Sequence, residues 1–501
     1  DNPLLMKYPN SKQFPLDIVG SSTFGRDPKI LSSRTFNMIE ADNFLVDYGG
    51  YKVVAEILSS GEGRGLFSSA TANQMIGCVD NNIYAISVFG QTLQNRKIYN
   101  VRYIGSINSF AGDVFFDENN TNQIAICDKS DIYIYDYIDL IFQKATLPEG
   151  FIPGYVTYQD GRFIAPDTNS AAWALSQVGD GLNWFWDPSG GPVLGAIQTK
   201  GTRAVATVRF PGRGNLLLVM GENVSELWTD VGGAQFPYQR SASVNIDYGC
   251  LNPATIAAQD SIIVWLGVNE KAGPTIMYST GSDAKQISTD GINFKFEQLV
   301  NPARSTGFFM RLAGHLIYQL TFYDPRDNYS LIYDFTTQKF FDVTDENMNY
   351  HIARRVASFD NDYYFISLND GNLYQIAADF YTYDYGTTIK NIPRKRVCSN
   401  VRLPDSTPFI VNQATMTVEQ GNDVDNDGND PIYLPNVSLS VSTNGGISFS
   451  GWSDQELNTV GHRQNMVRWW NLGMSNDFVA QFSFNSTGSW KASNGILDTY
   501  Q

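Results

Sequence analysis

The chain has 501 residues, of which 51 are acidic and 35 are basic, and its formal net charge at pH 7 is -16. This balance argues against a protein that grips nucleic acid, because phosphate binding requires clustered Lys and Arg side chains. The densest basic run is Arg394, Lys395 and Arg396, and a run of this length is typical of a solvated strand end.

The composition favours a globular, mostly β protein. Aromatic residues make up 13% of the chain, with 27 Tyr and 31 Phe, and these residues suit half-buried sheet surfaces. The longest apolar runs fall short of the ~18 residues that cross a bilayer, so no membrane segment is predicted. The 4 cysteines and 3 histidines are scattered, which predicts neither a disulfide framework nor a zinc site and fits folding in a reducing compartment.

The first segment, residues 1–60, is expected to be an irregular N-terminal arm with an entry strand. Its stretch "GRDPKILSSRTFNMIEADNF" is polar and lacks the alternation that follows later in the chain.

Residues 61–385 repeat one pattern, in which an apolar run, a turn and an alternating run follow one another, as in "MIGCVDNNIYAIS", "VTYQDGRFIAP" and "DYYFISLNDGNLYQI". This is the signal of a β-hairpin, and Asn81-Asn82 and Asp370-Gly371 fall where a two-residue turn needs positive φ. Hairpins of this size cannot bury their faces alone, so we predict a β-propeller of about six to seven blades. A long β-sandwich is the competing architecture.

Residues 386–501 are expected to form a separate C-terminal β domain. Strands such as "NVSLSVS" and "FVAQFSF" alternate with a period of two. The pair Trp469 and Trp470 could stack on sugars or bases, but large aromatic residues dominate the cores of β domains, so both are predicted to pack.

The stretch "STNGGISF", residues 442–449, fits the Asp-box pattern of a tight turn, with weaker relatives at "GDGLNWF" and "STDGINF". Asn and Asp side chains bond to nearby backbone in such turns, and a Gly permits the bend, while the aromatic is expected to plug the core. We therefore predict structural turns, without a ligand, at the following residues: Ser442, Asn444, Gly446 and Phe449, and Asp290, Gly291 and Phe294.

A propeller with such boxes raises the possibility of a sialidase-like hydrolase, in which a Tyr nucleophile pairs with an acid. Such an enzyme also needs several arginines converging on the substrate carboxylate, and "VRYIGS" is a poor substitute for the arginine motif. No catalytic residues and no enzyme activity are predicted.

Asp423, Asp425 and Asp427 alternate before Gly428 and resemble the first half of a calcium loop. The position that should supply a bidentate Glu is Leu434. Either this loop binds calcium or it is an acidic, exposed loop. No other cofactor is predicted, because the chain lacks phosphate-binding glycine motifs.

The chain resembles the packaged-DNA stabilisation proteins, or tail hubs, of short-tailed phages related to P22. The resemblance is carried by the order of several stretches: "SRTFNMI", "GGYKVV", "LLLVMGENVSELWTDVGGAQFPYQRSASVNIDYGCLNPATIAAQDSIIVWLG", "GSDAKQIST", "STNGGISFSGW" and "VRWWNLG". The chain departs from the family at the acidic loop over residues 422–430.

The resemblance implies a structural protein of the virion tail that assembles in the host cytoplasm. It implies a homo-oligomeric, hexameric ring below the head-to-tail adaptor, with a tail needle, fibre or spike as further partners, and closure of the channel until DNA is ejected. An acidic wall would let DNA pass without specific binding. The arm and the C-terminal domain are the candidate ring contacts. A carbohydrate-binding or receptor-binding virion module is the alternative.

Overall fold

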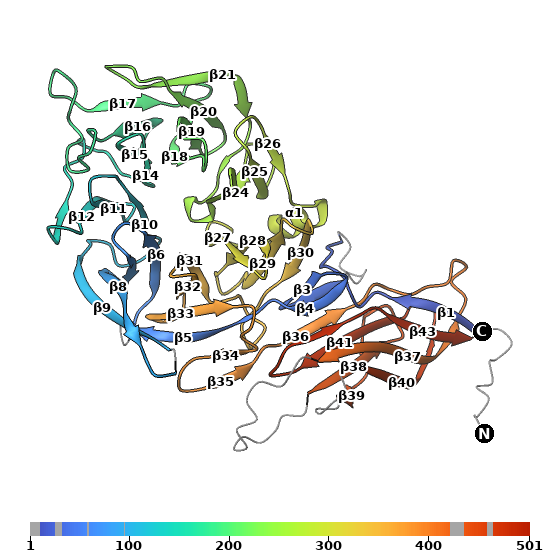
Figure 1. Ribbon diagram of the computed structural model, residues 1–501. Coiled ribbons are helices and arrows are strands. Elements are labelled where there is room, and N and C mark those ends of the chain that lie inside the picture. Colours follow the sequence, from blue (N-terminus) through green and yellow to red (C-terminus); the bar gives the residue numbers. More distant parts are fainter. Residues whose placement is uncertain are drawn as a thin grey trace.

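The computed structural model describes residues 11–25, 33–57, 60–94, 96–420, 435–457 and 464–500. These residues form a ring of β-sheets with a second β domain beside it (Figure 1). The only regular helices of the described part are the short 3-10 helix η1 (Pro253–Thr255) and α1 (Asp290–Glu297). The prediction of an all-β protein with a propeller is confirmed.

Five sheets of the ring each come from one continuous stretch of chain, and four consecutive strands form the sixth, which continues into a larger sheet. The first three contain β6 (Gly63–Ser69), β7 (Gln74–Val79), β8 (Asn82–Gln91) and β9 (Lys97–Ser106); β10 (Phe115–Glu118), β11 (Gln123–Cys127), β12 (Ile132–Asp136) and β13 (Ile141–Lys144); and β14 (Thr157–Gln159), β15 (Arg162–Pro166), β16 (Ala172–Leu175) and β17 (Val193–Ala196). The next three contain β18 (Ala204–Arg209), β19 (Leu216–Gly221), β20 (Ser225–Asp230) and β21 (Tyr238–Ile246); β22 (Gly249–Cys250), β23 (Ala257–Gln259), β24 (Ile262–Val268), β25 (Thr275–Ser279) and β26 (Ala284–Gln286); and β27 (Ser305–Leu312), β28 (His315–Phe322), β29 (Tyr329–Asp334) and β30 (Lys339–Asp342).

A seventh sheet closes the ring with strands from distant parts of the chain. It joins β31 (Ala353–Phe359), β32 (Asp362–Ser367) and β33 (Asn372–Ala377) to β5 (Gly50–Glu56), which pairs antiparallel with β33. The short strands β34 (Thr382–Asp384) and β35 (Ile389–Asn391) extend this sheet beyond β5. Because β31 also lies against β6, the first and last sheets of the ring are neighbours.

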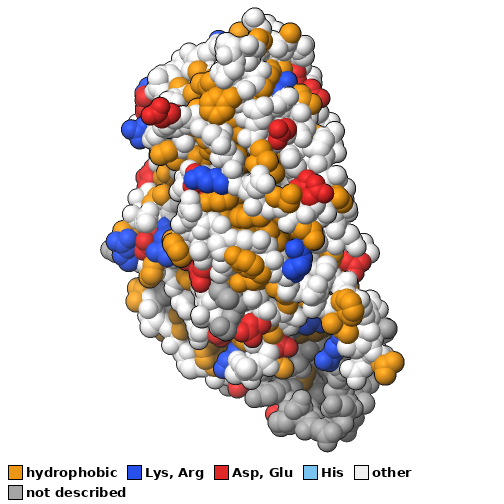
Figure 2. All heavy atoms as spheres, turned by 90° about the vertical axis from the view of Figure 1, so that its left-hand side faces the viewer, with side chains coloured by type: hydrophobic (Ala, Val, Ile, Leu, Met, Phe, Trp, Pro, Cys, Tyr) orange, Lys and Arg blue, Asp and Glu red, His pale blue; other side chains and the backbone are white. Residues whose placement is uncertain are grey.

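One side of the ring carries charged side chains that are separated by hydrophobic and neutral atoms. Figure 2 shows the side on which β9, β12 and β17 lie, where hydrophobic atoms are spread between well-separated charged side chains. The exposed apolar residues of the first two sheets include Phe89, Leu93, Ile138 and Leu140. No helix of the described residues is long and apolar enough to cross a membrane.

The C-terminal β domain shares its sheets with the N-terminal segment. One sheet contains β1 (Ser11–Leu16), β43 (Gly495–Tyr500), β37 (Phe409–Gln420), β42 (Trp490–Ala492), β4 (Phe44–Asp47) and β3 (Met38–Ala41), with β40 (Gln464–Ser475) paired to β37. The other continues from β30 through β2 (Arg34–Phe36) into β36 (Arg394–Val397), β41 (Val479–Asn485), β38 (Asn436–Ser442) and β39 (Ser453–Glu456). Strand β2 therefore joins the ring to the domain.

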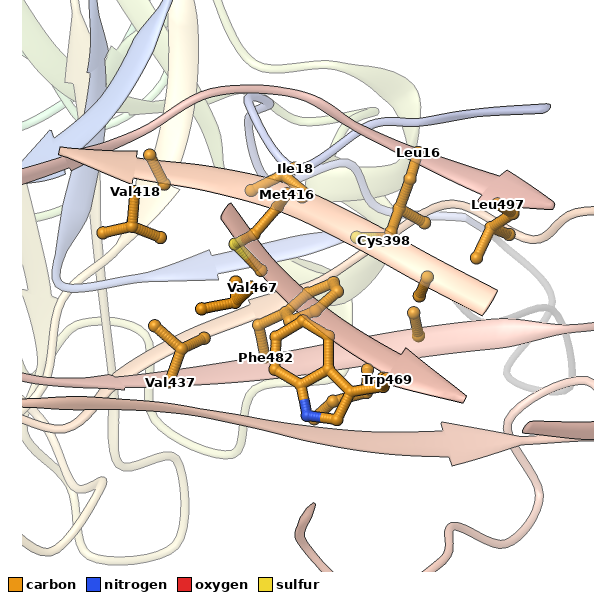
Figure 3. Close-up of a cluster of buried hydrophobic side chains, with 14 of the residues drawn as sticks. Leu16, Ile18, Cys398, Met416, Val418, Val437, Val467, Trp469, Phe482 and Leu497 are labelled. Carbon is orange, nitrogen blue, oxygen red and sulfur yellow. The ribbon is translucent and has the colours of Figure 1, made fainter. Parts of the chain in front are cut away.

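The core of the C-terminal domain takes side chains from both ends of the chain (Figure 3). Leu16 and Ile18 lie in the same buried cluster as Met416, Trp469 and Phe482. The sequence predicted a reaching arm with one entry strand and missed the further strands within it. Strand β1 pairs with β43, hundreds of residues away, and a strand without a local partner leaves no hairpin signal, whereas the short local hairpin of β3 and β4 lies in a stretch that was interpreted as irregular.

Several hairpins turn through two residues with positive φ, as the turn chemistry predicts. Asp160 and Gly161 have φ values of 46° and 84°, and Asp360 and Asn361 have values of 49° and 65°. The two turns that the sequence predicted, at Asn81-Asn82 and Asp370-Gly371, differ from the observed turns. Asn82 already pairs with Val79, so Asp80 takes the positive φ of 50°. The turn at Asp370 is a longer loop in which Asp370 Oδ1 accepts from the Asn372 amide at 2.9 Å.

Candidate functional site

The box at residues 442–449 is a hydrogen-bonded turn between β38 and β39. Ser442 Oγ accepts from the Gly446 amide at 2.8 Å, and Asn444 Oδ1 accepts from the Ser448 amide at 3.0 Å. Gly446 has a φ of 89°, which favours glycine. These contacts account for the residue types of the box without a ligand.

The prediction of a hairpin turn at Asp290, Gly291 and Phe294 was wrong, because these residues open helix α1. Thr289 is the N-cap, and its side chain accepts from the amide of Ile292. The same small polar residues favour helix caps and turns, so the sequence did not separate the two structures. Gly291 is required for another reason: a Cβ atom there would collide with the carbonyl oxygen of Phe24 in the arm.

The aromatic residues that end the boxes do not plug a core as predicted. Phe449 and Phe294 are half-buried, and Phe185 is exposed. In the stretch at 179–185 the neighbouring Trp184 is buried instead, and its Nε1 donates to the Gly181 carbonyl at 2.8 Å.

The three aspartates of the proposed calcium loop, Asp423, Asp425 and Asp427, lie outside the described residues, so calcium binding stays a prediction. Within the described ranges, no group of three or more His, Cys, Asp or Glu side chains could hold a metal ion.

The two arginines of the basic run at the start of β36 are buried and Lys395 between them is half-buried, which corrects the expectation of a solvated strand end. Arg394 forms an ion pair with Asp47 and donates to the carbonyls of Tyr381 and Ser486 at 2.9 and 3.0 Å. Trp490 Nε1 donates to the second carboxylate oxygen of Asp47 at 3.0 Å. This cluster ties β4, the segment between β33 and β34, and the C-terminal domain together.

Arg396 holds the N-terminal segment against the same strand. Its guanidinium donates to the Asp17 and Ser21 carbonyls at 2.8 and 3.0 Å and to Thr35 Oγ1 at 2.9 Å. No sequence pattern predicts these contacts, because the partners are mostly backbone carbonyls.

Two further buried arginines lie where the ring closes. Arg354 of β31 forms ion pairs with Asp113, at 3.0 Å, and Glu62, and donates to the Gly63 carbonyl at 2.9 Å. Arg64 of β6 donates to the carbonyls of Gly112, Ser109 and Ala111 in the connection between β9 and β10. Together they link the seventh sheet, the first sheet and the loop that leads to the second.

The histidines within the described residues have structural surroundings. His315 Nδ1 lies 2.7 Å from Asp334 Oδ2. His351 is fully buried beside the rings of Tyr51 and Phe365, and burial lowers its pKa to about 3. His462 lies outside the described residues.

The two adjacent tryptophans of β40 differ in their surroundings. Trp469 is buried in the core, whereas Trp470 is 51% exposed. The prediction that both would pack was therefore wrong for Trp470, as expected for neighbours on opposite faces of a strand.

These features define a β-propeller protein with an attached β domain. The family is indicated by a sequence comparison: residues 75–310 match the model of a family described as "Bacteriophage P22 Gp10, beta-propeller". This segment runs from β7 of the first sheet through the fifth sheet and into β27 of the sixth, and the match confirms the resemblance to the phage stabilisation family. No curated protein matches the chain.

Several solved structures are similar to the chain at low sequence identity. The N-terminal domain of Nup159 has a TM-score of 0.39 and 10% identity, covering 69% of this chain and 99% of that one. A catalytically inactive virginiamycin B lyase from Staphylococcus aureus has a TM-score of 0.42 and 12% identity, covering 65% and 99%. With TM-scores under 0.5, these likenesses carry no argument about activity.

Proposed function

We propose that this phage structural protein is the tail hub, or nozzle, that attaches below the head-to-tail adaptor. Copies of the chain form a hexameric ring that closes the tail channel around packaged DNA and later forms part of the ejection conduit. The observation that supports this proposal most strongly is the family match over residues 75–310, which falls on a closed propeller.

The charge of the chain fits a conduit through which DNA must slide. With a net charge of -16, an acidic wall repels phosphates, and this repulsion acts over a Debye length of ~10 Å at 0.1 M salt. The further partners of the proposal are a tail needle and fibre or spike proteins.

The ring needs two different contact faces on each subunit, because cyclic contacts above two-fold are heterologous. The described arm is largely engaged within its own chain, through the pairing of β1 with β43 and of β5 with β33. The C-terminal domain is therefore our first candidate for a contact between subunits. Its outer sheet face carries Met466, Trp470 and Met474, which are all exposed.

The test is to mix the purified protein with purified adaptor rings and to determine the stoichiometry by native mass spectrometry. The proposal expects six copies of this chain on each adaptor ring, with neither glycan binding nor sialoside hydrolysis by the isolated protein. Glycan-array binding without adaptor binding would favour the receptor-binding module, and turnover of a fluorogenic sialoside would favour the hydrolase.

A further inference from the structure

A cavity of about 550 Å³ lies at the centre of the propeller. It is lined by residues of β6, β10, β23, β27 and β31. Of these strands, β6, β10, β27 and β31 are labelled around the middle of the ring in Figure 1. Its volume falls within the ~300–1,000 Å³ of small-molecule sites. The cavity is distinct from the surfaces that the tail-hub proposal invokes.

Aromatic side chains form part of the wall of this cavity, and polar atoms make up more of its exposed lining than apolar atoms. Phe115, Tyr155 and Phe309 are among the residues that line it, together with the aliphatic side chains of β6 and β23. Such a wall suits a small ligand that carries both a ring and a charged group, because aromatic side chains pack against the ring and polar groups of a concave site fix the ligand's orientation.

One charged side chain, Arg355, lies among the residues that line the cavity, all of which belong to the described part of the chain. Its Nη1 donates to the Gly307 carbonyl at 2.8 Å, and its guanidinium carbon lies 5.6 Å from the centre of the Phe115 ring. Asp113, an acid whose charge acts on Arg355, is paired with Arg354 at 3.0 Å. A guanidinium has five N–H donors, so Arg355 retains donors for an anion inside the cavity.

We propose that the central cavity binds a small organic carboxylate, with the carboxylate on Arg355 and the apolar body against Phe115, Tyr155 and Phe309. The planar guanidinium matches a carboxylate in a bidentate geometry. Arg355 is half-buried and has no carboxylate hydrogen-bonded to it among the described residues, so an anionic ligand would stabilise its charge. Burial also lowers the pKa of Arg355, a direction that a bound anion would oppose.

The test uses benzoate as the probe and benzamide, its neutral analogue of the same shape, as the control ligand. Isothermal titration calorimetry on the full chain is expected to give binding of benzoate and at least about 10-fold weaker binding of benzamide, because a hydrogen bond to a charged group is lost. Equal binding of the two ligands, or no heat from benzoate, would overturn the proposal.

Arg355→Met is expected to weaken benzoate binding by about 10- to 100-fold, while Arg311→Met, at a half-exposed arginine paired with Asp260, leaves it unchanged. Ala258→Trp provides a second variant that does not remove a buried charge. Ala258 lines the cavity and is exposed, so the added ring fills the space and blocks benzoate. Unaltered benzoate binding in either cavity variant would rule out this site.

Discussion

At the scale of single residues, fully buried arginines mark the places where distant segments of the chain meet. Arg64 and Arg354 lie at the closure of the ring, and Arg394 and Arg396 lie at the junction with the C-terminal domain. The sequence predicted the last two to be solvated, because a short basic run usually is. Their burial depends on acids and carbonyls that only the fold brings together.

Arg394→Met is expected to lower the free energy of unfolding by about 3–5 kcal/mol, since it leaves Asp47 buried without its cation. The control is Arg402→Met, because Arg402 is 50% exposed and its pair with Asp477 should contribute only ~0–1 kcal/mol. Urea unfolding followed by tryptophan fluorescence measures both. Similar losses in the two variants would contradict the role assigned to burial.

His351 is expected to make stability depend on pH. An unfolded histidine takes up a proton near pH ~6.5, whereas burial lowers the folded-state pKa of His351 to about 3. The unfolded state therefore binds more protons between these values, and the free energy of unfolding falls as the pH falls from 6.5 towards 3, by up to ~1.4 kcal/mol per pH unit.

Removing the ionisable ring in His351→Phe should flatten this part of the curve, because Phe suits the aromatic surroundings and takes up no proton. The measurement is denaturant unfolding of both proteins between pH 4 and 7. Curves that stay parallel over this range would show that His351 does not contribute to the pH dependence.

At the scale of elements, the local hairpins were predictable and the long-range pairings were not. "VTYQDGRFIAP" forms β14 and β15 with a turn at Asp160 and Gly161, as its alternation indicated. In contrast, β5 pairs with β33 across more than 300 residues of chain, and no local pattern specifies such a partner. The stretch "STDGINF" shows a third case, in which one set of cap residues suits both a turn and a helix.

Lys52→Pro tests whether β5 closes the ring. Lys52 has strand partners on both sides, Gln375 of β33 and Asp384 of β34, so its missing N–H would leave a carbonyl unsatisfied, at a cost of about 1–3 kcal/mol. Ile389→Pro, in the exposed edge strand β35, should cost less. Differential scanning fluorimetry compares the two. An equal or larger loss for the edge variant would argue against β5 as the closing strand.

At the scale of the whole molecule, the propeller and the C-terminal domain share strands instead of being joined by a linker. Strand β2 continues the sheet of β30 into β36, and β1 pairs with β43. The composition and repeats were sufficient to predict the two parts, but they did not reveal this continuity. We expect the two parts to move as one body in an assembled ring.

The assembled protein is expected to bind duplex DNA only weakly, because its net charge of -16 repels phosphates. Fluorescence anisotropy with labelled DNA at several salt concentrations measures this affinity. Tight binding that weakens steeply with salt would instead indicate released counterions and a basic DNA-binding surface.

Cryo-electron microscopy of the virion tail tests the central claim most directly. The account predicts a ring of six copies directly below the adaptor, each fitted by the propeller and the C-terminal β domain as a single body. Tail density below the adaptor that has no place for the propeller would contradict it.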